Sequence, residues 1–165
     1  MNLRIIVLEE RGDYLKIGVY NIINDPFPKL NLIKTINIKK SECKCDTDMV
    51  NMMNRELLLN KLSSEHIFAL VFNLSLTPLG VLQLGVGNHK ESFADMKTLG
   101  CGLLLLGGEQ FVCFHNHPGG VKTISQSDKE LTSKYEDVAD LFNIYFIRHL
   151  MVTKDNYVKC PDLWR

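Results

Sequence analysis

The sequence lacks a long hydrophobic run. Its longest nearly uncharged stretch, from Thr98 to Gly108, is far too short to cross a bilayer core, which needs about 20 consecutive apolar residues. The opening residues, MNLRIIVLEE, reach an acidic pair too early to contain the apolar region of a signal peptide. We therefore expect no membrane span and a cytoplasmic location.

An excess of either charge is also missing. Nineteen Lys and Arg residues are balanced by nineteen Asp and Glu residues. Proteins whose main task is to bind nucleic acid carry a clearly basic face, so this balance argues against direct nucleic-acid binding, although it leaves room for a local basic patch. Apolar residues make up 45% of the chain, enough for a globular core that needs no disulfide to fold.

Cysteines are too few, and odd in number, for a disulfide framework. Five cysteines favour free thiols in a reducing compartment. Cys43 and Cys45 form a single CxC pair without a second pair at zinc-ribbon spacing, so we interpret them as loop residues and not as a metal site. Internal repeats and low-complexity runs are absent from the sequence, which excludes a solenoid.

The first forty-five residues read as a β-rich segment. Arg11-Gly12-Asp13 lies between two stretches rich in β-branched and aromatic residues, and it favours a hairpin turn over an adhesion tripeptide. Asn24-Asp25-Pro26 marks a loop before a third alternating stretch. The predicted strands span residues 3–8, 14–20 and 32–39.

From Asp46 onward the pattern alternates between helices and strands. Met49, Met53 and Leu57 recur at helical spacing, which predicts a helix within residues 47–62 with methionines filling the core. Gly100 and Gly102 weaken a predicted helix unless it packs closely on a sheet. The order β–β–β–α–β–β–α–β–α–β–β predicts an α/β domain with helices against a mixed sheet. The later elements are strands at 66–73 and 80–87, a helix at 92–106, a strand at 110–114, a helix after Ser125 with its apolar side on Leu131, Tyr135, Val138 and Phe142, and strands at 144–152 and 156–160.

Polar residues with metal-binding chemistry follow the strand at 110–114. His115 and His117 are two residues apart, so both imidazoles leave the same face of a strand and can converge on one ion. Ser125 then begins a helix, and Asp128 lies one turn inside it, where its carboxylate can become a third ligand. Three protein ligands with a fourth position left open are the arrangement of catalytic zinc.

Two structural explanations compete with this interpretation. Ser125 and Asp128 also match a helix capping box, which needs no metal. An HxH pair on a strand alone can be half core and half surface. The two roles of the capping residues are compatible, and the combination of HxHP with both later residues rarely arises by chance.

These residues resemble the zinc motif of the JAMM (MPN-plus) superfamily, which is His-x-His, seven residues, then Ser-x-x-Asp. Within it the chain is most similar to the RadC branch, through HNHPGG at 115–120, SQSDKELT at 125–132 and Arg148-His149. EHIFALVFN at 65–73 resembles the first core strand of the family, which a catalytic Glu precedes. The resemblance implies a JAMM/MPN-like (cytidine-deaminase-like) fold over residues 46–165, with residues 1–45 as an N-terminal β extension.

The chain departs from the RadC pattern at three places. Gly119 stands where Ser is usual, a minor change in the turn at residues 118–120. Arg148 stands where Asp is typical, so the resemblance assigns it no role beside the ligands. The β extension replaces the helix-hairpin-helix module that often precedes this domain, which removes one expected DNA contact.

The resemblance also implies a mechanism. One zinc ion per chain is held by His115, His117 and Asp128, Glu65 acts as general base, and Ser125 donates a hydrogen bond to the developing oxyanion. The leading hypothesis is a metallopeptidase or isopeptidase acting on a protein or peptide; the alternative is a zinc-bearing accessory factor in DNA repair or mobile-element biology. A nuclease would favour carboxylate-rich two-metal ligation, and ligands for one metal only are apparent. The competing side chains are Glu109 for the base, and His66, His89 and His149 for ligand or supporting roles.

Overall fold

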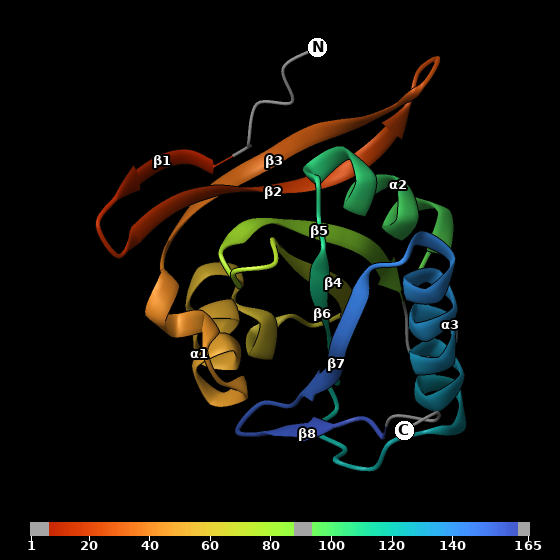
Figure 1. The fold of residues 1–165 in the computed structure, drawn as a ribbon. Helices are drawn as coiled ribbons and strands as arrows, with labels where there is room; N and C mark the ends of the chain where they lie inside the picture. The colour runs from red at the N-terminus through yellow and green to blue at the C-terminus, as the bar shows by residue number, and fades with distance from the viewer. Residues whose placement is uncertain (1–6, 88–93, 162–165) are drawn as a thin grey trace.

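Eight strands form a single mixed sheet in the computed structural model, which describes residues 7–87 and 94–161. Helix α1 (Asp46–Leu57) covers one face, whereas α2 (Met96–Leu106) and α3 (Gln126–Phe142) cover the other (Figure 1). The element order and the α/β class match the prediction. The strands are β1 (Val7–Arg11), β2 (Tyr14–Asn24), β3 (Pro28–Lys39), β4 (Glu65–Phe72), β5 (Pro78–Gly87), β6 (Gln110–Asn116), β7 (Tyr145–Val152) and β8 (Tyr157–Lys159), and short 3-10 helices lie at η1 (Lys40–Cys43) and η2 (Leu59–Lys61).

The strand order is β1-β2-β5-β4-β6-β7-β8, and β3 pairs with β2. The predicted hairpin between β1 and β2 is confirmed, with Gly12 in the left-handed region at φ +63°; residues 3–6 of its first strand lie outside the described part. β2 and β3 form a longer ladder than predicted, because strand pairing continues to Asn24 and Pro28 at the turn. β2 also pairs in parallel with β5, so the N-terminal strands extend the main sheet. The domain division after residue 45 stays a prediction.

Helix α1 buries its methionines against the sheet as the helical spacing predicts. Met49, Met52 and Met53 lie in one core cluster with side chains of β2, β3 and β4. The helix ends earlier than the predicted span, because Leu58 adopts a left-handed backbone conformation at φ 55° and a 3-10 turn follows.

Close packing explains the two glycines of α2. A Cβ on Gly102 would lie 2.5 Å from a methyl carbon of Leu82 on β5, and a Cβ on Gly100 would lie 2.6 Å from the Phe142 ring on α3. The second contact is with a helix and not with the sheet. Asp95 caps the N-terminus by accepting a hydrogen bond from the Lys97 backbone N–H; residues 92 and 93 of the predicted helix lie outside the described part.

Strand β6 is an interior strand of the sheet, antiparallel to β4 and parallel to β7. Its side chains alternate: Val112 and Phe114 join the α1 cluster, whereas Phe111 and Cys113 join the α2/α3 cluster. By this alternation His115 faces α3. None of the helices in the described ranges is long and apolar enough to cross a membrane.

Candidate metal centre

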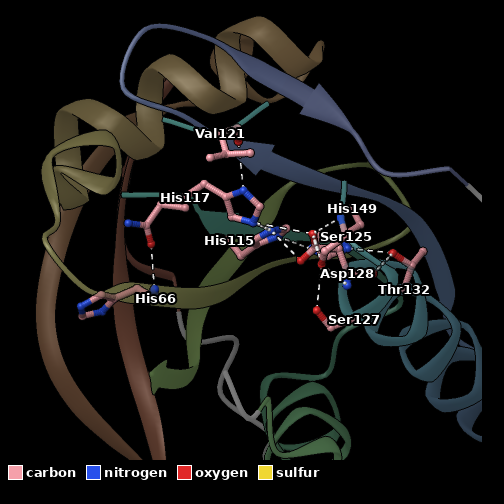
Figure 2. Close-up of polar contacts among 10 residues, drawn as sticks. His66, His115, His117, Val121, Ser125, Ser127, Asp128, Thr132 and His149 are labelled. Atoms are coloured by element: carbon pink, nitrogen blue, oxygen red, sulfur yellow. Dashed lines mark hydrogen bonds and ion pairs between the residues drawn. The ribbon is translucent and has the colours of Figure 1, made fainter. Parts of the chain in front are cut away.

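Two histidines meet at the C-terminal end of β6. His115 is fully buried, and its Nε2 lies 3.1 Å from Nε2 of His117. The Nδ1–H of His117 donates to the Val121 carbonyl 3.0 Å away, and the His117 backbone N–H donates to Val152 on β7. These contacts hold the loop at residues 117–121, called the metal loop below, against the sheet. They also direct both Nε2 atoms to one point (Figure 2).

The helix cap of α3 positions the carboxylate. Ser125 is the N-cap: its Oγ accepts from the Asp128 backbone N–H at 3.1 Å, and its own backbone N–H donates to Asp128 Oδ2 at 2.7 Å. The capping box therefore orients Asp128, whose carboxylate oxygens lie 3.2 Å from His115 Nε2 and 3.6 Å from His117 Nε2. The hydroxyl of Ser125 also donates to Asp128 Oδ2 at 2.7 Å, while the residue itself remains exposed.

Glu65 completes the cluster from a neighbouring strand. It is the first residue of β4, half-buried, and its carboxylate lies with ligand atoms of the other three residues inside a span of 4.8 Å. Asn116, between the two histidines, fixes this approach: its amide donates to the Ser64 carbonyl at 3.0 Å and accepts from the His66 backbone N–H at 2.7 Å. The residues on both sides of Glu65 are thus held to β6.

The donor set fits a metal ion. His117 spends its Nδ1 proton on Val121, so a neutral ring presents a lone pair at Nε2 towards the Asp128 carboxylate. Burial raises the pKa of Asp128, but its contacts with His115, His117 and Ser125 outweigh burial and hold the pKa well below its usual range. The Asp128 contact raises the pKa of His117 above the usual value, against the effect of burial. Two imidazole Nε2 atoms and a carboxylate that converge on one point are suited to bind a cation.

The competing side chains lie elsewhere, with one exception. The His66 ring contacts Ser64 Oγ and points away from the cluster (Figure 2), while Glu109 accepts from the Leu74 backbone N–H at the far end of β6. Arg148 pairs with Asp46 of α1 on the opposite face, 2.7 Å away. His149 is the exception, because its ring contacts His115. His89 lies outside the described residues, and all five cysteines are free.

A cavity of about 730 Å³ opens beside the metal loop. It lies between that loop, the segment leading into β4 and the β7–β8 turn, and Glu65, His115, His117 and Asp128 are not among its lining residues. Three of its lining residues are charged: Lys61, Lys154 and Asp155. The others are Asn60, Leu62, Ser63, Pro118 and Gly119.

Two residues of the site carried no sequence signal of their own. Asn116 acts on backbone groups of Ser64 and His66, and Thr132 contacts His149 across the α3–β7 interface. Each lies inside a quoted motif, but the partners are remote in sequence, so the contacts follow from the fold alone.

Comparison with known proteins identifies the domain. A family model of the RadC-like JAB domain matches residues 43–161, the greater part of the chain. The chain belongs to the RadC-like JAB domain family. The match includes Glu65, His115, His117, Ser125 and Asp128.

Relatives of this RadC-like JAB domain share low overall identity. A UPF0758 protein of Flavobacterium johnsoniae is 26% identical over 105 residues, which cover 64% of this chain and 46% of the relative. A UPF0758 protein of Listeria monocytogenes is 25% identical over 119 residues, 72% of this chain and 52% of the relative. In Actinobacillus pleuropneumoniae the match is 49% over 43 residues, 26% of this chain and 20% of the relative. The chain spans about half the length of the first two, and these names state no activity.

Proposed function

We propose that this RadC-like JAB domain is a zinc-dependent hydrolase that cleaves a peptide or isopeptide amide bond of a protein or peptide substrate. One observation carries the proposal: the Nε2 atoms of His115 and His117 and the Asp128 carboxylate converge within reach of a fourth, half-buried carboxylate. Two imidazoles and one carboxylate are a ligand set of catalytic zinc, which leaves a position open for water.

Each residue then has a task that its position supports. A bound zinc ion would acidify a water molecule and polarise the carbonyl of the scissile bond. Glu65, a half-buried member of the cluster, would take the proton of the attacking water and deliver it to the leaving amine. Ser125 orients Asp128, and the residue is exposed. Donation of a hydrogen bond by its hydroxyl to the oxyanion stays a prediction, because the hydroxyl proton goes to Asp128 in this structure.

Metal content tests the ligand assignment without any substrate. Purified protein should carry about one equivalent of zinc after dialysis, and His115→Ala and His117→Ala should each empty the site. His66→Ala is the matched control, because it removes a half-buried imidazole outside the cluster. Elemental analysis checks the result, and full zinc occupancy in both ligand variants contradicts the assignment.

The general base is tested separately by Glu65→Gln, which keeps the shape and the metal ligands. Loss of general acid–base help is worth about 10²–10⁴ in rate, so linkages cleaved by the unsubstituted protein in a proteome-wide search should survive in the variant. Equal cleavage by Glu65→Gln removes Glu65 from the mechanism. Absence of cleavage by both proteins, with zinc bound, favours the accessory-factor alternative.

A further inference from the structure

A register shift in the sheet brings His149 to the metal side. Phe146 packs in the α2/α3 cluster, Ile147 packs against the α1 cluster, and Arg148 pairs with Asp46 of α1. Two consecutive residues therefore face α1, at the shift in the β6–β7 pairing. Such a bulge re-aims the side chains that follow it, so His149 returns to the α3 face with its partner Cys113.

His149 joins the cluster to the core of α3. Its side chain is fully buried, its Nε2 lies 2.7 Å from His115 Nδ1, and its Nδ1 lies 2.9 Å from Thr132 Oγ1. The ring of Tyr135 lies edge-on at 5.1 Å between centroids. In Figure 2 Thr132, His149, His115 and Asp128 lie in one group, with dashed lines marking the contacts between them.

The direction of this hydrogen-bond chain is fixed at its end. Thr132 Oγ1 lies 2.8 Å from the backbone carbonyl of Asp128, which can only accept, so the Thr132 proton is committed to it. Thr132 Oγ1 must then accept from His149, which places a proton on Nδ1 of His149. The two nitrogens of this fully buried ring contact another imidazole and a hydroxyl, and burying a charge without an opposite charge beside it is costly. The ring is therefore neutral, and its Nε2 carries no proton.

We propose that His149 and Thr132 are positioning residues that fix the tautomer of His115. Because His149 Nε2 accepts, His115 must donate from Nδ1, and its Nε2 is left unprotonated towards His117 and Asp128. Both imidazoles thus present Nε2 lone pairs by separate devices, a backbone carbonyl for His117 and the His149–Thr132 chain for His115. This chain of hydrogen bonds ends on the backbone carbonyl of Asp128, so it connects His115 to Asp128 through His149 and Thr132.

The tautomer can be measured in metal-free protein by ¹⁵N NMR of the histidine rings at alkaline pH. The unsubstituted protein should show His115 protonated at Nδ1. In Thr132→Val, His149 loses its acceptor and can donate from Nε2, so His115 should shift to the Nε2-protonated form. His149→Phe removes the acceptor and should do the same, whereas His149→Gln, whose amide oxygen replaces Nε2, should retain the original tautomer.

Two outcomes overturn the proposal: His115 protonated at Nε2 in the unsubstituted protein, or an unchanged tautomer in Thr132→Val. If His149→Phe fails to fold, the other two variants still test the proposal. Thr132→Val is nearly isosteric, and His149→Gln keeps a hydrogen-bond acceptor.

Cobalt(II) titration measures how the tautomer of His115 affects metal affinity. This test rests on the proposed function. Loss of a hydrogen bond to a ligating histidine typically lowers metal affinity by about 10–100-fold, so His149→Phe should bind Co²⁺ that much more weakly and His149→Gln within a few-fold of the original. His66→Phe, away from the cluster, should match the unsubstituted protein. An unsubstituted protein that binds no Co²⁺ contradicts the metal site alone, whereas equal Co²⁺ affinity in His149→Phe contradicts the positioning role alone.

Discussion

Asn116 holds two segments of the site together through one buried amide. In Asn116→Ala the His66 N–H and the Ser64 carbonyl lose their partners. Both residues are half-buried, so we expect a cost of about 1 kcal/mol, the low end of the range for unpaired buried groups. We expect urea unfolding to show a loss of that size with zinc still bound at one equivalent. The control is Asn31→Ala, which breaks an exposed amide pair with Asn21 and should change stability by less than about 0.5 kcal/mol. Equal losses in the two variants contradict the role given to Asn116.

The charge of His117 predicts how metal binding depends on pH. Metals bind the deprotonated imidazole, so protons compete below the pKa of His117. The Asp128 contact raises that pKa above 6.5, while Asp128 stays ionised because its own pKa is held low. Co²⁺ affinity should therefore rise with pH, keep rising past pH 6.5 and level off only above the raised pKa. A Co²⁺ titration series checks this, and a plateau already reached below pH 6.5 contradicts it.

At the scale of elements, the contact between α2 and the sheet depends on the absence of a side chain at Gly102. Alanine there would place Cβ 2.5 Å from buried Leu82; overpacking costs about 1–3 kcal/mol, partly offset by about 1 kcal/mol of helix propensity. We expect Gly102→Ala to lose up to about 2 kcal/mol in urea unfolding. Gly119→Ala is the matched control, because no atom lies within 4 Å of its Cβ position, and a similar loss in both contradicts the packing argument.

Local patterns predicted most elements but not their ends. The period of Met49, Met53 and Leu57 gave α1, and the stripe from Leu131 to Phe142 gave α3, because each helix buries one face. The extra length of β2 and β3 comes from pairing across the turn, and Pro28 is tolerated at the start of its strand. The left-handed Leu58 is the C-cap of α1 and its side chain is exposed, so hydrophobic spacing does not mark it. The bulge at Ile147 belongs to the pairing of β7 with β6, a strand remote in sequence.

The candidate site divides in the same way. Four of its residues could be predicted because they lie in one short stretch of sequence, at the end of a strand and at a helix cap: His115, His117, Ser125 and Asp128. Glu65 came from resemblance only, since nothing local marks a carboxylate at a strand start. Its proximity depends on β4 pairing with β6, where Ile67 lies opposite His115.

At the scale of the whole molecule, the balance of charge limits binding to nucleic acid. Several basic side chains already contact carboxylates, such as Arg55 with Glu42 and Lys159 with Asp46. We expect a short DNA duplex to bind with a Kd of about 10⁻⁶ M or weaker at physiological salt, the range of non-specific contacts. Fluorescence anisotropy at several salt concentrations checks this. Sub-micromolar binding with a steep salt dependence would favour the accessory-factor alternative.

The crossover from β6 through α3 to β7 has a consequence for the order in which the centre is made on the ribosome. Glu65, His115, His117 and Asp128 all precede β7 in the chain, so the three proposed ligands and Glu65 have been synthesised before His149. Thr132, four residues after Asp128, is also made earlier. The last residue of the centre to be translated is therefore His149. A nascent chain carries all three proposed ligands before the residue that fixes the tautomer of His115 has been added.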